Sequence, residues 1–182
     1  YDLGITLSCG EQSEETYHRF FESGAHRYLL RIETASPDLY EKWHPEDGKH
    51  RFVTRLNCLK SLKEIGFQVG SGSMVGVPYQ TYEDIAGDIL FLRDMRVDMM
   101  GIGPFIEHSA TPFYRSEAYS IRQEERLGLT LRMIAILRIL LKDVNIASTT
   151  AMQVLDKFGR EKGLLFGANV IMPNLTPLIH RK

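Results

Sequence analysis

Short apolar runs alternate along the chain with longer segments in which apolar residues recur every three or four positions. The short runs predict strands, and the longer segments predict helices with one buried face. The expected strands span residues 5–8, 28–34, 67–75, 98–105, 144–149 and 168–172. The expected helices span residues 13–23, 54–65, 81–96 and 123–142, with a short helical turn at 159–166. The proline-containing stretch from 35 to 53 is expected to be a loop.

Capping residues mark the ends of several of these helices. Ser13 stands where an N-cap is needed, and Thr81 is followed three residues later by Asp84, a capping pattern. Gly66 follows the apolar stripe of the second helix and is expected to end it. The capping residues and the apolar periodicity therefore predict the same ends for these helices.

Strands that alternate with helices of this length predict parallel βαβ units with helices outside the sheet. About six such units suit either a doubly wound sheet or most of a (β/α)8 barrel. In both architectures, binding residues gather at the C-terminal ends of the strands. No linker or repeat interrupts the chain, so residues 1–182 are expected to form a single α/β domain.

Composition removes several classes of function. The chain has 182 residues, 43% of them hydrophobic and 25% charged, with a formal net charge of -1. These values are typical of a globular protein, and the charge gives no reason to expect nucleic-acid binding. The longest apolar runs are too short to cross a membrane. Cys9 and Cys58 cannot make a disulfide framework, so a reducing, cytoplasmic location is expected.

The expected strand at 28–34 carries the most informative side chains. Alternation turns Tyr28, Leu30 and Ile32 toward the helices, and it turns Arg27, Leu29, Arg31 and Glu33 to the other face. Buried charges are costly unless they are paired or bind a ligand. If that second face looks into a barrel, it favours a polar ligand cavity. The alternatives are an Arg31–Glu33 ion pair at the rim of the sheet and an amphipathic edge strand.

Polar and small residues at other strand ends favour the cavity. Thr6 and Ser8 share one face of the first strand, and Thr149 and Thr150 follow the fifth. The third strand carries the glycine-rich run 70–76, which allows a ligand or another backbone to approach closely. Patterns for a phosphate-binding loop, a dinucleotide site, a zinc site or a serine nucleophile are absent from the sequence.

Several segments together resemble one family, the HydE family of radical S-adenosylmethionine (SAM) maturases of FeFe-hydrogenase, within the biotin-synthase-like superfamily. The resemblance runs through essentially the whole chain, in order and with compatible spacing. The segments that carry it are 27–37 (RYLLRIETASP), 55–59 (RLNCL), 72–78 (GSMVGVP), 101–106 (GIGPFI), 148–152 (STTAM) and 167–177 (GANVIMPNLTP).

The resemblance implies a partial (β/α)8 TIM barrel that holds SAM and a 4Fe-4S cluster at its C-terminal mouth. In the family, one electron from the cluster cleaves SAM to a 5′-deoxyadenosyl radical. Glu33 would hold the ribose hydroxyls, Arg55 would pair with the methionyl carboxylate, and Ser8 would assist. The residues implied to line a deeper cavity for a small anionic or organometallic substrate are Thr6, Arg27, Arg31, Thr149 and Thr150. Other hydrogenase maturases are among the implied partners.

The chain also departs from the family pattern. The Cys-x3-Cys-x2-Cys cluster motif is absent, so the resemblance implies that strands three to eight are present and that cluster ligands stand upstream of residue 1. As such a fragment, the C-terminal three-quarters of the core barrel with the start of the C-terminal region, the chain alone would be inactive. Tyr79 stands where the family usually has glycine, and His180 stands where a tyrosine is common.

Two rival hypotheses remain from the sequence. The first is a biotin-synthase-like or other radical SAM paralogue. The second, from a different class, is a non-catalytic binding scaffold in which Arg27, Arg31 and Glu33 form a structural charge network. The position of Glu33 distinguishes a ligand site from a solvated surface.

Overall fold

A single parallel sheet organises the chain. The structure is a computed structural model that describes residues 3–173 together with Pro177 and Ile179. Seven strands belong to this described part: β1 (Thr6–Leu7), β2 (Arg27–Leu29), β3 (Gln68–Ser71), β4 (Met74–Val75), β5 (Met99–Pro104), β6 (Asn145–Ser148) and β7 (Val170–Ile171). Every pairing between them is parallel. The predicted α/β class is therefore confirmed.

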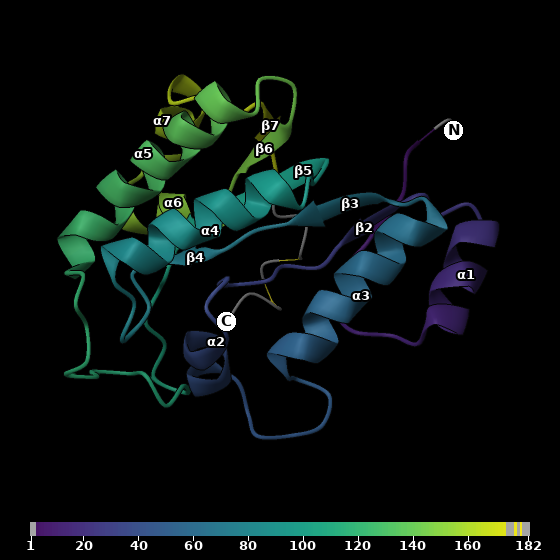
Figure 1. Cartoon of the computed structure of the whole chain (residues 1–182). Coiled ribbons are helices and arrows are strands. Elements are labelled where there is room, and N and C mark those ends of the chain that lie inside the picture. Colours follow the sequence, from purple (N-terminus) through teal and green to yellow (C-terminus); the bar gives the residue numbers. More distant parts are fainter. Residues whose placement is uncertain (1–2, 174–176, 178, 180–182) are drawn as a thin grey trace.

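Helices follow the strands and cover the sheet (Figure 1). They are α1 (Glu14–Glu22), α2 (Pro37–Trp43), α3 (Phe52–Ile65), α4 (Tyr82–Asp94), α5 (Gln123–Leu140), α6 (Thr150–Leu155) and α7 (Gly159–Leu165). The predicted caps are confirmed: Ser13 accepts a hydrogen bond from the Thr16 amide, and Thr81 with Asp84 forms a capping box. No helix in the described ranges has the length and apolar character needed to cross a membrane.

Strand order decides between the two predicted architectures. The order is β1-β2-β3-β5-β6-β7, with β4 pairing β5, so each later strand of the main path adds to the same edge. A doubly wound sheet reverses its direction of growth at a switch point, and this sheet does not. The chain forms a half-barrel, and the doubly wound alternative is excluded.

The core divides into two apolar clusters on the helix side of the sheet. One contains Tyr17, Tyr28 and Leu59 between α1, α3 and β2, and the other contains Met100 and Ile134 between β5 and α5. Phe91 and Met95, in and just after α4, pack against both clusters. The two clusters thus join through α4.

Four segments differ from the sequence prediction. Helices α2 and α6 were not predicted, because seven and six residues are too short to show a helical period. The expected strand 67–75 is broken into β3 and β4 at Gly72-Ser73. Regular pairing of β2 ends at Leu29, and Glu33 then takes the left-handed conformation, with φ of 68°.

Tyr79 also has a left-handed backbone, with φ of 68°. This is the position at which the family that the sequence resembles usually has glycine. We expect Tyr79→Gly to stabilise the protein by about 0.5–1 kcal/mol. Relief of the left-handed strain is partly offset by the flexibility of glycine and by loss of the contact with Lys42, whose Nζ lies 5.3 Å from the ring centre. Urea unfolding measures the change.

Tyr82 supplies the matched control for this substitution. It is also exposed, but it begins α4 and has an ordinary helical backbone. Tyr82→Gly should therefore destabilise the protein by a similar amount. A loss of stability in both variants would contradict strain at Tyr79.

Candidate ligand site at the C-terminal ends of the strands

The two faces of the chain around β2 differ as the alternation predicts. Tyr28, Leu30 and Ile32 are buried against the helices, with at most 3% exposure. Leu29 and Arg31 instead line a hollow of about 490 Å³ on the opposite, concave face. The other lining residues are Met74, Gly101, Gly103, Pro104, Phe105, Ile106, Thr149, Thr150, Ala151, Met172 and Pro173. A mostly apolar hollow with a few polar groups is typical of a small-molecule site.

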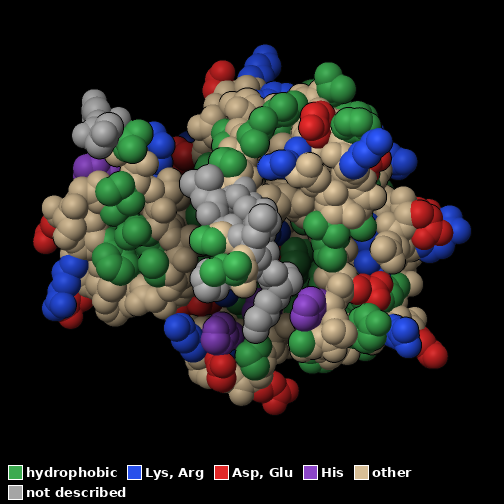
Figure 2. Space-filling model, turned by 180° about the vertical axis from the view of Figure 1, so that it is seen from behind, with side chains coloured by type: hydrophobic (Ala, Val, Ile, Leu, Met, Phe, Trp, Pro, Cys, Tyr) green, Lys and Arg blue, Asp and Glu red, His purple; other side chains and the backbone are tan. Residues whose placement is uncertain are grey.

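The described part of this concave side is seen from behind in Figure 2, where hydrophobic side chains lie among charged groups of both signs. The parallel strands all end at the same edge, so residues from β2, β5 and the β6–α6 turn meet around one hollow. Arg31, Thr149 and Thr150 are brought together there. The Thr149 hydroxyl donates to the Ile102 carbonyl at 3.2 Å, which fixes its side chain at the wall.

Thr6 and Arg27, which the resemblance placed in the same cavity, lie at a different depth of the sheet from Arg31, Thr149 and Thr150. They pair across β1 and β2 and line a separate hollow of about 380 Å³ with Gln68, Asp98 and Asn145. That hollow is at the N-terminal ends of the strands and shares no lining residue with the first. Two residues rise about 6.6 Å along a strand, so side chains of one face still belong to different layers.

Glu33 lies at the end of the β2 segment, where its backbone is fixed on both sides. Its amide donates to the Gly72 carbonyl at 3.0 Å, and its carbonyl accepts from the Met74 amide at 3.1 Å. Its Oε2 lies 3.1 Å from Nη2 of Arg31, so the ion pair considered from the sequence does form. That oxygen is nevertheless buried and accepts no hydrogen bond from the part of the chain that the structure describes. The carboxylate thus retains an unused acceptor.

Arg55, at the start of α3, is bound on two edges. Its Nε donates to Glu11 Oε1 at 2.6 Å, and its Nη1 donates to the Arg31 carbonyl at 2.6 Å. Both charged side chains are largely buried, with exposures of 11% for Arg55 and 5% for Glu11. The Arg55 guanidinium therefore binds a carboxylate, that of Glu11. A carboxylate is also the kind of group that the family resemblance assigned to Arg55. Ser8 is exposed and makes no hydrogen bond within the described chain.

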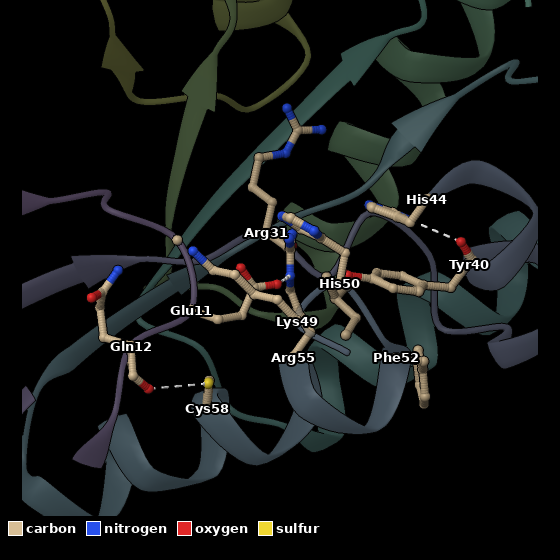
Figure 3. A network of polar contacts seen from close by, with 12 residues as sticks. Glu11, Gln12, Arg31, Tyr40, His44, Lys49, His50, Phe52, Arg55 and Cys58 are labelled. Atoms are coloured by element: carbon tan, nitrogen blue, oxygen red, sulfur yellow. Dashed lines mark hydrogen bonds and ion pairs between the residues drawn. The ribbon is translucent and has the colours of Figure 1, made fainter. Parts of the chain in front are cut away.

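Two residues of the site were missed by sequence reasoning. Glu11 follows the β1 strand after a Cys-Gly turn, and only an acidic group near a strand end could have drawn attention to it. Tyr40 is on α2, inside the stretch expected to be a loop. Figure 3 shows the Tyr40 ring pointing from α2 toward Arg55 and Glu11. Burial raises the pKa of Tyr40 to about 12, so its phenol stays protonated at neutral pH.

Of the two groups that the resemblance implies, the described residues fit SAM and do not fit a 4Fe-4S cluster. A polar ligand with hydroxyl and carboxylate groups suits the free acceptor of Glu33 and the guanidinium of Arg55. An iron–sulfur cluster finds no such fit here: Cys9 is exposed, Cys58 is buried, and no cluster of three metal-ligating side chains occurs among the residues that the structure describes. His180 lies outside the described residues.

A parallel half-barrel with a polar ligand site at the C-terminal strand ends defines a protein of the (β/α)-barrel enzyme class. Residues 2–92, half of the chain, match the family described as the Radical SAM superfamily. The chain belongs to the radical SAM superfamily.

Relatives narrow this assignment. The chain is 49% identical, over 99% of its length, to the [FeFe] hydrogenase maturase subunit HydE of Thermotoga maritima, and it covers 49% of that protein. It is 30% identical over 93% of its length to 3-methylornithine synthase of Methanosarcina acetivorans, covering 45% of it. The chain therefore spans about half the length of these relatives. The crystal structure of a methylornithine synthase has the same fold, with a TM-score of 0.77 and 22% identity over 93% of this chain and 47% of that one.

Proposed function

We propose that the protein is a radical SAM maturase of the HydE type. It would cleave SAM reductively to a 5′-deoxyadenosyl radical for assembly of the FeFe-hydrogenase diiron cofactor. The observation that carries this proposal is the 49% identity to HydE along nearly the whole chain. We further propose that residues 1–182 belong to one radical SAM core barrel, with a 4Fe-4S cluster held by residues other than those described.

In this proposal, the chain's own residues bind and orient SAM. The Glu33 carboxylate, whose Oε2 pairs with Arg31 but accepts no hydrogen bond within the described residues, accepts hydrogen bonds from the ribose diol. Arg55 receives the methionyl carboxylate while Glu11 and the Arg31 carbonyl hold its guanidinium in place. Ser8 is the weakest member, because nothing in its surroundings directs it at the ligand. The hollow lined by Arg31, Thr149 and Thr150 receives a small-molecule or organometallic substrate, and other maturases are candidate partners.

The alternatives make different use of the same residues. A biotin-synthase-like paralogue is supported by 28% identity to biotin synthase of Corynebacterium jeikeium, well below the identity to HydE. A non-catalytic scaffold is supported by the Arg31–Glu33 ion pair and by the Arg27–Gln68 hydrogen bond of 2.8 Å. Only the scaffold predicts that Glu33 is irrelevant to SAM.

Calorimetric titration of the full-length protein with SAM tests the site. Glu33→Gln keeps the shape and the left-handed backbone preference close to native, whereas alanine would change both. We expect this variant to bind SAM roughly tenfold or more weakly, because a charged acceptor for two hydroxyls is lost. Arg55→Lys should weaken SAM binding to a similar extent, because lysine cannot form a bidentate pair with the methionyl carboxylate.

Glu64→Ala is the control, since Glu64 is exposed near the far end of α3 from Arg55. It should leave SAM affinity unchanged. Unaltered affinity in both Glu33→Gln and Arg55→Lys would remove the proposed site and favour the scaffold.

A further inference from the structure

Tyr40 carries a buried hydroxyl group with no hydrogen-bond partner. The residue has no exposed surface, and its Oη makes no hydrogen bond with any residue that the structure describes. A buried hydroxyl without a partner is costly, and the great majority of such groups are paired in folded proteins. An orphaned donor beside a ligand site is therefore expected to find its partner when the ligand binds.

The surroundings of Tyr40 hold the ring firmly in one orientation. The His44 ring stacks on it at 3.8 Å between centroids, and the Phe52 ring meets it edge-on at 5.6 Å. The His44 ring also contacts the Tyr40 carbonyl through Nδ1 at 2.8 Å. Because one ring stacks on Tyr40 and another meets it edge-on, the direction of its hydroxyl is fixed before any ligand arrives.

That direction leads to the carboxylate-binding end of the site. The Arg55 guanidinium lies 5.7 Å from the centre of the Tyr40 ring, and the Glu11 carboxylate is bound to the same guanidinium. The charges of Arg55, Glu11 and Glu33 all act on the phenol, with Arg55 ahead of the two carboxylates. Arg55 uses Nε and Nη1 for its contacts, whereas its Nη2 makes no hydrogen bond within the described ranges. Arg55 and Tyr40 thus each keep a donor that has no partner among the described residues, and the two side chains lie next to each other.

We propose that the Tyr40 hydroxyl donates a hydrogen bond to the carboxylate of the ligand held by Arg55. This inference rests on the proposed function, in which the ligand is SAM. Tyr40 would then act as a specificity residue: it favours ligands that carry a carboxylate and contributes nothing to binding of the adenosine part. Glu11 marks where a carboxylate can lie against Arg55.

Tyr40→Phe tests the inference, because it removes the hydroxyl and keeps the ring packing with His44 and Phe52. Affinities of the full-length protein for two probes are compared by calorimetry. The probes are SAM and 5′-methylthioadenosine, which has the adenosine and sulfur but no amino-acid carboxylate. We expect the variant to bind SAM roughly tenfold more weakly and to bind 5′-methylthioadenosine with unchanged affinity.

Tyr119→Phe is the matched control, since its hydroxyl already donates to the Phe113 carbonyl at 2.9 Å, away from Arg55. It should leave both affinities unchanged. Unchanged SAM affinity in Tyr40→Phe, or equal losses for both probes, would overturn the inference. If Glu33→Gln weakens SAM binding while Tyr40→Phe does not, the inference about Tyr40 fails and the proposed SAM site stands. If the unaltered protein binds no SAM, both the inference and the proposed SAM site fail.

Discussion

Replacing Gly72 with alanine is expected to destabilise the protein by roughly 3 kcal/mol or more. Gly72 lies in the break between β3 and β4, directly against β5. A Cβ built there would be 2.1 Å from the Gly101 carbonyl oxygen and 2.8 Å from its carbon. These are backbone atoms of a neighbouring strand, so no flexible side chain can move aside.

The same substitution should also disturb the ligand site. The Gly72 carbonyl accepts the hydrogen bond from the Glu33 amide, so a shift of Gly72 displaces the left-handed turn that carries Glu33. Urea unfolding reports the loss of stability, and SAM titration reports the second effect. Because the added Cβ clashes with the backbone of β5, the Gly72 backbone has to shift, and affinity should fall even under conditions where the variant remains folded.

Gly128→Ala is the control for this prediction. Gly128 is in the middle of α5, and a Cβ there would meet nothing within 4 Å. Alanine should therefore stabilise that helix by about 0.5–1 kcal/mol. Native-like stability of Gly72→Ala would contradict the close packing of the two strands.

Asp88→Asn is expected to gain stability relative to the unaltered protein as the pH rises from 5 to 8. Asp88 is 1% exposed on α4, and burial raises the pKa of its carboxyl to about 7. Its Oδ1 accepts from the Ala35 amide at 2.5 Å, just beyond Glu33, and its Oδ2 has no partner. An asparagine oxygen can accept the same bond without a charge to bury.

The sign follows from the protons bound in each state. Between the unfolded pKa of 3.8 and the folded value near 7, the folded protein holds a proton that the unfolded chain has released. The unaltered protein therefore loses stability as the pH rises through this window. Above the window, the contribution of Asp88 to the free energy of unfolding no longer changes with pH. The advantage of Asp88→Asn should grow by about 2–3 kcal/mol between pH 5 and pH 8.

Urea unfolding of both proteins at several pH values measures this difference. Asp94→Asn is the control, because Asp94 is exposed at the end of the same helix and its pKa is lowered through a hydrogen bond with Arg93. The Asp94 carboxyl stays ionised from pH 5 to pH 8. The stability of this variant should therefore change with pH in the same way as that of the unaltered protein. A parallel curve for Asp88→Asn would show that the buried carboxyl is already ionised at pH 5.

Much of the local structure followed from the sequence because it depends on neighbouring residues. Alternation along residues 28–32 placed Tyr28 and Arg31 on opposite faces, and both lie there. Thr81, Asp84 and Gly66 marked helix ends through hydrogen bonds and backbone preferences confined to a few residues. Glu33 and Arg55 were singled out through the resemblance to a family. The structure adds that Glu33 lies just past β2 and that Arg55, at the start of α3, donates to the neighbouring Arg31 carbonyl.

Only the tertiary structure decided what depends on residues far apart in the chain. Strand order selected the half-barrel, because a local pattern is the same in a barrel and in a doubly wound sheet. The pairing of Glu11 with Arg55 spans 44 residues, and no period in the sequence encodes it. Depth along the strands separated Thr6 and Arg27 from Arg31, although all three face the same side. Local patterns determine the direction of each side chain, and long-range packing determines which side chains meet.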